Sequence, residues 1–207
     1  LSLVLRRDGY SKLPKDNRWG TFPGISAGWV LSRENFMESC SNVLSYAKIR
    51  ASYGANGNVS GVLDANGNVV TGLDYYTVQG SYGIMKDKDG KIVPNYNGKV
   101  PLMINDLPNP TMRWEKSYTF ETGFDIGFLN NKYILNFTYY NRHTQDKFAE
   151  ITLPSHSGVS SFLSNNGEVQ NQGMELELTA NVLRTKDWKF TVSMNTAYNK
   201  NKIISLP

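Results

Sequence analysis

The sequence predicts an all-β fold in which antiparallel, up-and-down strands form part of the wall of a transmembrane β-barrel. Three observations predict it: apolar and polar residues alternate over long segments, those segments are longer than most strands of globular sheets, and the connections between them are alternately long and short. The 12 Tyr, 9 Phe, 4 Trp and 18 Gly also favour strands joined by turns.

The clearest alternation covers residues 113–128. One face carries Trp114, Tyr118, Phe120, Phe124, Ile126 and Phe128, and the other carries only polar, charged or glycine residues. A turn at Asn130-Asn131 leads into residues 133–142, which alternate in the same way, so these two segments predict a β-hairpin. Residues 169–183 and 188–199 predict a second hairpin of the same kind.

Seven wall strands follow from this pattern. We expect them at residues 1–7, 22–32, 46–56, 113–128, 133–142, 169–183 and 188–199. The connections at 129–132 and 184–187 are tight, whereas those at 8–21, 57–112 and 143–168 are long or rich in turns. The connection at 33–45 should be short but is longer, and one helical turn is expected at 33–40.

Outer-membrane barrels have short periplasmic turns and long external loops. Residues 57–112 and 143–168 are therefore predicted to be long extracellular loops, the first with an extra strand within residues 72–84. Tyr75, Tyr76 and Tyr82 in this loop are candidates for contact with a ligand or with a protein that covers the barrel. Near the short turns, Trp29, Phe128, Tyr133 and Trp188 are expected to form an aromatic girdle, unless they close the end of a soluble core.

Charged residues lie on the polar side of the alternating strands. They are Arg50, Glu115, Glu121, Asp125, Arg142, Glu175 and Glu177. Buried in a soluble barrel, each would cost several kcal/mol unless paired, whereas a wide, wet or plugged lumen removes that cost. We expect them to form ion pairs along the wall or with a plug domain, with direct substrate contact as the alternative.

Other classes of function have little support in the sequence. No run of 18 apolar residues predicts a transmembrane helix, although the mean hydropathy of −0.43 is uninformative for strands that alternate. The 22 Lys and Arg are scattered, which argues against nucleic-acid binding. Cys40 has no disulfide partner, and His143 and His156 lack neighbouring ligands, so neither a metal nor another cofactor is predicted. No catalytic residue is assigned.

Five ordered segments resemble the SusC/RagA family of TonB-dependent outer-membrane transporters of the Bacteroidota. They are LRRDGYSKLPKDNRWGTFPGISAGW at 5–29, KIRASYGANGN at 48–58, NPTMRWEKSYTFETGFDIGFLNNK at 109–132, GEVQNQGMELEL at 167–178 and NTAYNKNKI at 195–203. The resemblance covers almost the whole chain except residues 59–108 and 143–166. Several blocks in one order are far more specific than a single motif.

The resemblance implies a 22-stranded barrel with an internal plug that imports glycans or peptides. It implies three kinds of partner, namely a SusD-like surface lipoprotein, TonB and the lipid of the outer membrane, and no nucleic acid. The chain is then expected to be part of the barrel, residues 1–207, without the plug domain and the C-terminal strands. A second hypothesis stays open, a soluble all-β carbohydrate-binding module whose apolar strand face is turned into a core.

Overall fold

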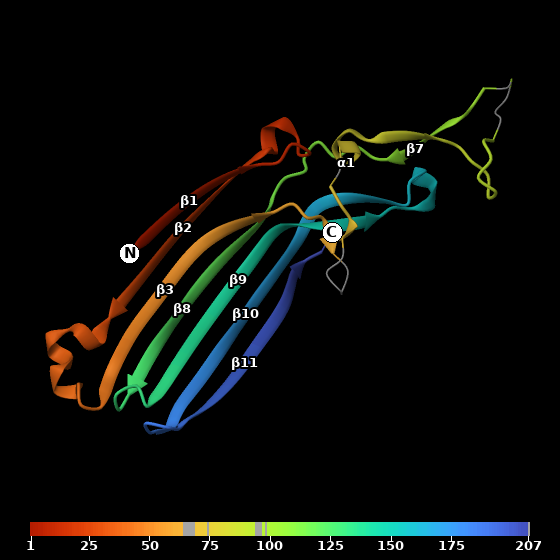
Figure 1. The fold of residues 1–207 in the computed structure, drawn as a ribbon. Coiled ribbons are helices and arrows are strands. Elements are labelled where there is room, and N and C mark those ends of the chain that lie inside the picture. The colour runs from red at the N-terminus through yellow and green to blue at the C-terminus, as the bar shows by residue number, and fades with distance from the viewer. Residues whose placement is uncertain (64–68, 74, 94–96, 98, 207) are drawn as a thin grey trace.

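A single antiparallel sheet of seven long strands dominates the chain (Figure 1). The computed structural model describes residues 1–63, 69–73, 75–93, 97 and 99–206. The strands are β1 (Ser2–Gly9), β2 (Trp19–Val30), β3 (Leu44–Asn58), β8 (Glu115–Phe128), β9 (Tyr133–Thr152), β10 (Ser161–Arg184) and β11 (Lys189–Ser205). They pair in the order β1-β2-β3-β8-β9-β10-β11, which confirms the predicted all-β, up-and-down class. The sheet is open, with β1 and β11 as its two edge strands.

Short connections lie at one end of the sheet. They are the turns 129–132 and 185–188 and a segment with two 3₁₀ helices, η2 (Leu31–Arg33) and η3 (Asn35–Cys40). These two helices confirm the helical turn expected at 33–40. Trp29, Phe128, Tyr133 and Trp188 all lie at this end, and the indole N–H of Trp29 donates to Glu34 at 2.9 Å. Among the described residues, the structure contains no helix with the length and apolar character needed to cross a bilayer.

Long connections lie at the opposite end. The longest joins β3 to β8 and contains β4 (Val62–Leu63), β5 (Val69–Thr71), α1 (Tyr75–Gln79), β6 (Ser81–Ile84) and β7 (Leu102–Asp106). β6 and β7 form a hairpin that extends away from the sheet (Figure 1). The extra strand expected within 72–84 is therefore only partly correct, because Tyr75 and Tyr76 begin a short helix and only the last four residues are strand. Two further 3₁₀ helices, η1 (Lys15–Asn17) and η5 (Ser155–Ser157), lie in the other long connections.

The strands are longer at this end than the alternation predicts. β9 continues to Thr152 and β10 starts at Ser161, so most of the segment 143–168 expected as a loop is strand. The register between them shifts between Ser164 and Val169, and Asp146 has a positive φ of 56°. Because such bulges interrupt the period of two, the pattern of apolar residues no longer reports the strand there.

The strand registers define two faces of the sheet, because directly paired residues point to the same side. Two successive rows across β3, β8, β9, β10 and β11 are Ala47, Ile126, Leu135, Leu178, Met194 and Ile49, Phe124, Phe137, Leu176, Thr196. The rows between and beside them are Lys48, Asp125, Asn136, Glu177, Asn195 and Arg50, Gly123, Thr138, Glu175, Ala197. We call the first side the apolar face and the second side the polar face.

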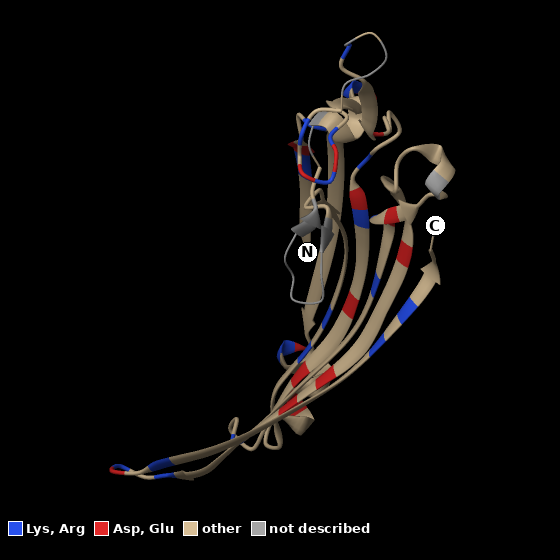
Figure 2. Cartoon of the chain, turned by 90° about the vertical axis from the view of Figure 1, so that its right-hand side faces the viewer, with Lys and Arg blue, Asp and Glu red and all other residues tan. Residues whose placement is uncertain are grey.

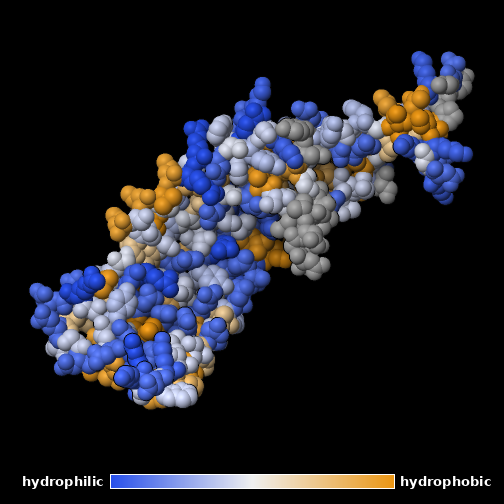
Figure 3. All heavy atoms as spheres, viewed as in Figure 1, coloured by the Kyte–Doolittle hydropathy of each residue, from blue (hydrophilic) through white to orange (hydrophobic). Residues whose placement is uncertain are grey.

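Apolar side chains of the sheet stay exposed. Ile49, Phe120, Met174 and Val192 on the apolar face are each 42–47% exposed. The sheet curves along its length (Figure 2). The side of the molecule seen in Figure 3 is largely hydrophilic, with apolar side chains gathered along the β1 edge. The strands therefore present a continuous apolar surface with the chemistry of a lipid-facing barrel wall.

The buried core lies at the end of the sheet with the long connections. Its members are Leu13, Phe22, Leu73, Met112, Trp114, Phe148 and Leu163. Phe22 and Trp114 pack edge to face at 5.5 Å between ring centroids, and the Trp114 indole donates to the backbone oxygen of Arg18 at 3.2 Å. This core fixes the long connections over the strand ends.

Candidate functional site

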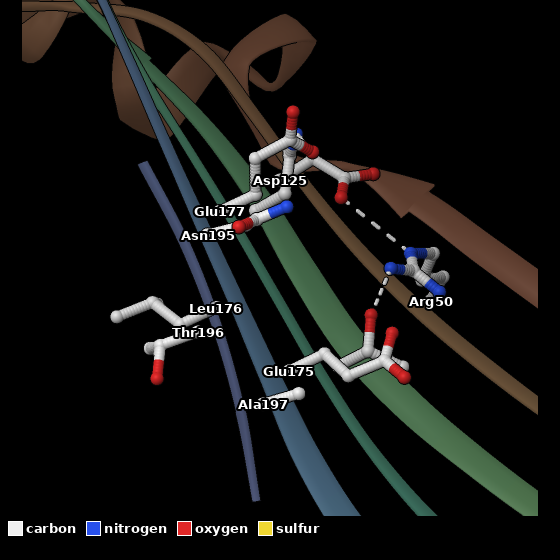
Figure 4. A pocket seen from close by; sticks show the side chains of 10 residues that line it. Arg50, Asp125, Glu175, Leu176, Glu177, Asn195, Thr196 and Ala197 are labelled. Atoms are coloured by element: carbon white, nitrogen blue, oxygen red, sulfur yellow. Dashed lines mark hydrogen bonds and ion pairs between the residues drawn. The ribbon is translucent and has the colours of Figure 1, made fainter. Parts of the chain in front are cut away.

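An open cavity of about 760 Å³ lies on the polar face between β3 and β11. It is lined by Arg50, Asp125, Asn136, Thr138, Glu175, Leu176, Glu177, Asn195, Thr196 and Ala197 (Figure 4). Arg50 reaches from β3 across β8, where its Nε lies 3.5 Å from the Asp125 carboxylate and its Nη2 donates to the Thr138 hydroxyl at 2.6 Å. One arginine thus links three neighbouring strands.

Three carboxylates line the same cavity as this arginine. They are Asp125, Glu175 and Glu177, and the amide of Asn136 donates to Glu177 at 3.3 Å. With one cation and three anions among its lining residues, the cavity has an acidic character. Because Arg50 and Asp125 are both partly exposed, their ion pair contributes at most about 1 kcal/mol to stability. Both side chains are therefore partly open to solvent on the polar face.

The absence of a side chain at Gly123 leaves space for the Arg50 guanidinium on the polar face. A Cβ on Gly123 would lie 2.2 Å from the backbone oxygen of Phe137 and 3.3 Å from the Arg50 guanidinium. Gly173 serves Tyr140 in the same way, because a Cβ there would lie 2.6 Å from the phenolic oxygen. The polar face is therefore shaped by residues that let long side chains lie flat on the strands.

The remaining predicted polar-face residues separate into two groups. Glu121 and Arg142 line a neighbouring cavity of about 290 Å³, where the Nε of Arg142 donates to Thr119 at 3.3 Å. Glu115 is only 3% exposed, and its carboxylate accepts hydrogen bonds at 2.7 Å from the Asn58 side chain and from the backbone N–H of Phe148. Glu115 is thus a structural group that joins β3, β8 and β9.

Two asparagines that our sequence reasoning missed hold the long connections together. Asn165 accepts from the backbone N–H of Arg113 at 2.9 Å and donates to the backbone oxygens of Arg113 and Asp146 at 2.9 and 2.7 Å. Asn109 donates to the backbone oxygen of Leu163 at 2.9 Å and is 6% exposed. Asn109 lies in a segment that resembles the family, whereas Asn165 lies outside those segments, and an isolated Asn usually indicates a turn.

An ion pair reinforces the same junction. Arg113 Nη2 donates to Asp146 at 2.6 Å. This hydrogen bond raises the pKa of Arg113, against a smaller opposing effect of burial and with a further contribution from the Asp146 charge. The pair fixes the start of β8 to the bulge of β9.

The three loop tyrosines do not form one cluster that the structure describes. Tyr76 in α1 is 59% exposed, and Tyr82 in β6 is 75% exposed. The side chain of Tyr75 lies outside the described residues. Beside Tyr82, the β6–β7 hairpin also exposes Ile84, Leu102 and Met103. The exposed surface of this connection is thus broader and more apolar than the tyrosines alone predict.

Within the described part of the chain, no three His, Cys, Asp or Glu residues are grouped as metal ligands would be. His143 instead lies 2.6 Å from Glu168.

Known proteins of similar sequence match nearly the whole chain. TonB-dependent receptor P3 of Formosa agariphila is 33% identical over 206 residues, and TonB-dependent receptor SusC of Bacteroides thetaiotaomicron is 32% identical. These matches cover 100% and 99% of this chain but 19% of each relative. The chain therefore spans about a fifth of the length of these relatives.

Solved structures show the same sheet. The RagAB peptide importer in its closed-closed state matches with a TM-score of 0.78 and 26% identity, covering 99% of this chain and 20% of that one. The siderophore receptor PirA of Pseudomonas aeruginosa shares the fold at a TM-score of 0.55 and 16% identity, covering 96% of this chain and 30% of that one. The family described as TonB dependent receptor-like, beta-barrel matches residues 1–205, and the chain belongs to this family.

Proposed function

We propose that the chain is a wall segment of an importer that takes up glycans or peptides across the outer membrane with energy delivered through TonB. One observation carries the proposal: the same strands present an exposed apolar face and a polar, charged face in strict alternation. Contact with lipid stabilises the apolar face, and a water-filled or plugged lumen solvates or pairs the charges of the polar face. The chain contributes binding surfaces and passage, and no catalytic step.

Membership of the TonB-dependent receptor family implies a location in the Gram-negative outer membrane. The relatives in Formosa and Bacteroides support a bacterium of the Bacteroidota as the source. The RagAB peptide importer supports the peptide alternative, while the resemblance to SusC/RagA supports glycans as well. In this arrangement 57–112 and 143–168 form the extracellular side.

A SusD-like surface lipoprotein is the proposed partner on that side. The β6–β7 hairpin leaves Tyr82 and Leu102 exposed at 75% and 69%, although apolar side chains of this size favour a covered position. On the polar face, Arg50, Asp125, Glu175 and Glu177, with Glu121 and Arg142, are proposed to contact the plug or the substrate. The half-exposed apolar face does not favour the soluble carbohydrate-binding alternative, which needs that face in a core.

Uptake in cells tests the importer. We expect deletion of the gene for the full-length protein to abolish growth on one class of substrate, oligosaccharides or peptides, and complementation to restore it. A deletion strain that imports both classes as the parent strain does would contradict the proposal.

Copurification tests the partner separately. The full-length protein with Tyr82→Ser and Leu102→Ser should retain less surface lipoprotein than the wild type after extraction in mild detergent. Lys88→Ser and Lys91→Ser, near the tip of the same hairpin, serve as the matched control. Equal retention by all forms would remove the hairpin from the interface.

A further inference from the structure

The apolar face ends in one row of paired residues on β9, β10 and β11, and two same-face positions further along on β8. Its last apolar or aromatic residue is Tyr118 on β8, Tyr139 on β9, Met174 on β10 and Tyr198 on β11, and the next residue on the same face is Lys116, Asn141, Gln172 and Lys200, respectively. From Tyr118 to Phe128 the strand runs roughly 33 Å, or about 25 Å of membrane thickness at a tilt near 40°. This is the height of a transmembrane apolar band.

A groove of about 410 Å³ lies across this boundary on β3, β8 and β9. Its lining is Tyr53, Tyr118, Phe120, Asn141, His143 and Gln145. The aromatic residues belong to the apolar side of the boundary, and the amides and the imidazole to the polar side. The groove therefore offers flat ring surfaces beside hydrogen-bonding groups.

Basic residues lie on both sides of the groove on the same face. Lys116 pairs with Gln145, which lines the groove. In the other direction, the row of His143 continues through Gln170 to Lys202, and the row of Asn141 continues to Lys200. At a strand spacing of about 4.8 Å, these two lysines lie roughly 10 Å from β9. The acidic residue of this region, Glu168, is in contact with His143 at 2.6 Å.

We propose that the groove and its three lysines bind the phosphorylated sugar head group of a glycolipid in the outer leaflet. The sugar ring packs against Tyr118 and Phe120, the amides hydrogen-bond to its hydroxyls, and the lysines neutralise phosphate. The acyl chains continue down the apolar face. This inference rests on the proposed membrane location, and it adds a ligand on the outside of the wall, away from the transport path.

Lipid titration of the full-length protein tests the site. Purified in neutral detergent, the protein is titrated with diphosphoryl lipid A, with its dephosphorylated form and with phosphatidylglycerol, and bound lipid is counted by native mass spectrometry. We expect diphosphoryl lipid A to bind most tightly. The double variant Lys200→Gln, Lys202→Gln should weaken its binding about tenfold. Tyr118→Ala should weaken lipid A binding and leave phosphatidylglycerol unaffected.

The matched control removes two positive charges from the other end of the same hairpin, Arg184→Gln with Lys189→Gln. It should keep the wild-type affinity. The inference is overturned if the Lys200, Lys202 variant binds as the wild type does, or if phosphatidylglycerol or the dephosphorylated lipid binds as tightly as lipid A. The proposed membrane location is tested separately in untitrated protein. If a lipid-soluble reagent does not reach the apolar face there, the membrane location is wrong.

Discussion

Leu135 and Asn136 are neighbours in the chain, yet they belong to surfaces with opposite requirements. Leu135 lies in a row of apolar residues across five strands, and Asn136 lies in a row with Asp125 and Glu177. The apolar face carries mostly apolar and aromatic residues along its rows, with only the threonines Thr122 and Thr196 among them, whereas the polar face mixes charges, glycines and hydroxyls. A surface that contacts lipid needs only apolar area. A surface that lines an aqueous lumen and contacts a plug or a substrate needs particular shapes and charges. Tolerance to substitution therefore depends on the face of the sheet more than on the position along a strand.

Introducing a charged residue on the apolar or on the polar face should give the largest difference in the free energy of unfolding. In the full-length protein, Leu135→Arg should lower the free energy of unfolding by about 2–4 kcal/mol, because the guanidinium enters the apolar band. Asn136→Arg, one residue away, should change it far less. Urea unfolding in bilayers measures both, and equal destabilisation by the two variants would break the comparison.

Glycine substitution tests the shape of the polar face. Gly123→Ala should cost about 1–3 kcal/mol, because the new methyl group would lie 2.2 Å from the Phe137 oxygen and would displace Arg50. Gly24→Ala is the control, since the nearest atom to its Cβ, Gly54 Cα, is 3.9 Å away. The same unfolding assay applies. A Gly123 variant as stable as the Gly24 variant would show that the strands adjust freely.

The division into an apolar and a polar face does not hold at the end of the sheet with the long connections. Asn165→Ala should cost about 1–2 kcal/mol, since backbone groups of Arg113 and Asp146 lose their partner in a part-buried place. Hydrogen exchange at the Arg113 amide should become faster. Asn201→Ala on exposed β11 is the control. Unchanged hydrogen exchange at the Arg113 amide in the Asn165 variant would show that this asparagine does not hold the two segments together.

The ion pair on the polar face should contribute least. A double-mutant cycle with Arg50→Met and Asp125→Asn should give a coupling energy below about 1 kcal/mol, because both side chains are partly exposed. A coupling well above this value would show that the pair is shielded from solvent in the full-length protein. It would then belong to the packing of the wall and would not be free to contact a plug or substrate.

The sequence was sufficient for the strand-rich fold because the period of two is explicit wherever one face meets lipid. Residues 113–128 and 133–142 show it most clearly, and the structure pairs Phe128 with Tyr133 across the predicted turn. Beyond the apolar band, bulges in β9 and β10 interrupt the period of two and part of the sheet packs against the buried core, so the residue pattern no longer distinguishes strand from loop. This is why β9 and β10 extend further than expected.

The site was predictable only in part. Alternation correctly put Arg50, Asp125, Glu175 and Glu177 on one face, but their convergence around one cavity depends on a register that the sequence does not state. Glu115 accepts a hydrogen bond from the backbone N–H of Phe148, 33 residues away, and the contacts of Asn165 join segments 52 and 19 residues apart. Such long-range contacts leave no local signal.

Accessibility of the two faces is the most direct test of the account. In the full-length protein in membranes, with the exposed Cys40 replaced by Ser, single cysteines are introduced as Phe124→Cys and Leu135→Cys on the apolar face and as Thr119→Cys and Thr138→Cys on the polar face. A lipid-soluble reagent should label the first pair, and a water-soluble reagent should label the second. If the first pair is shielded from both reagents while the second reacts from bulk water, the apolar face packs in a core and the account of a membrane importer is wrong.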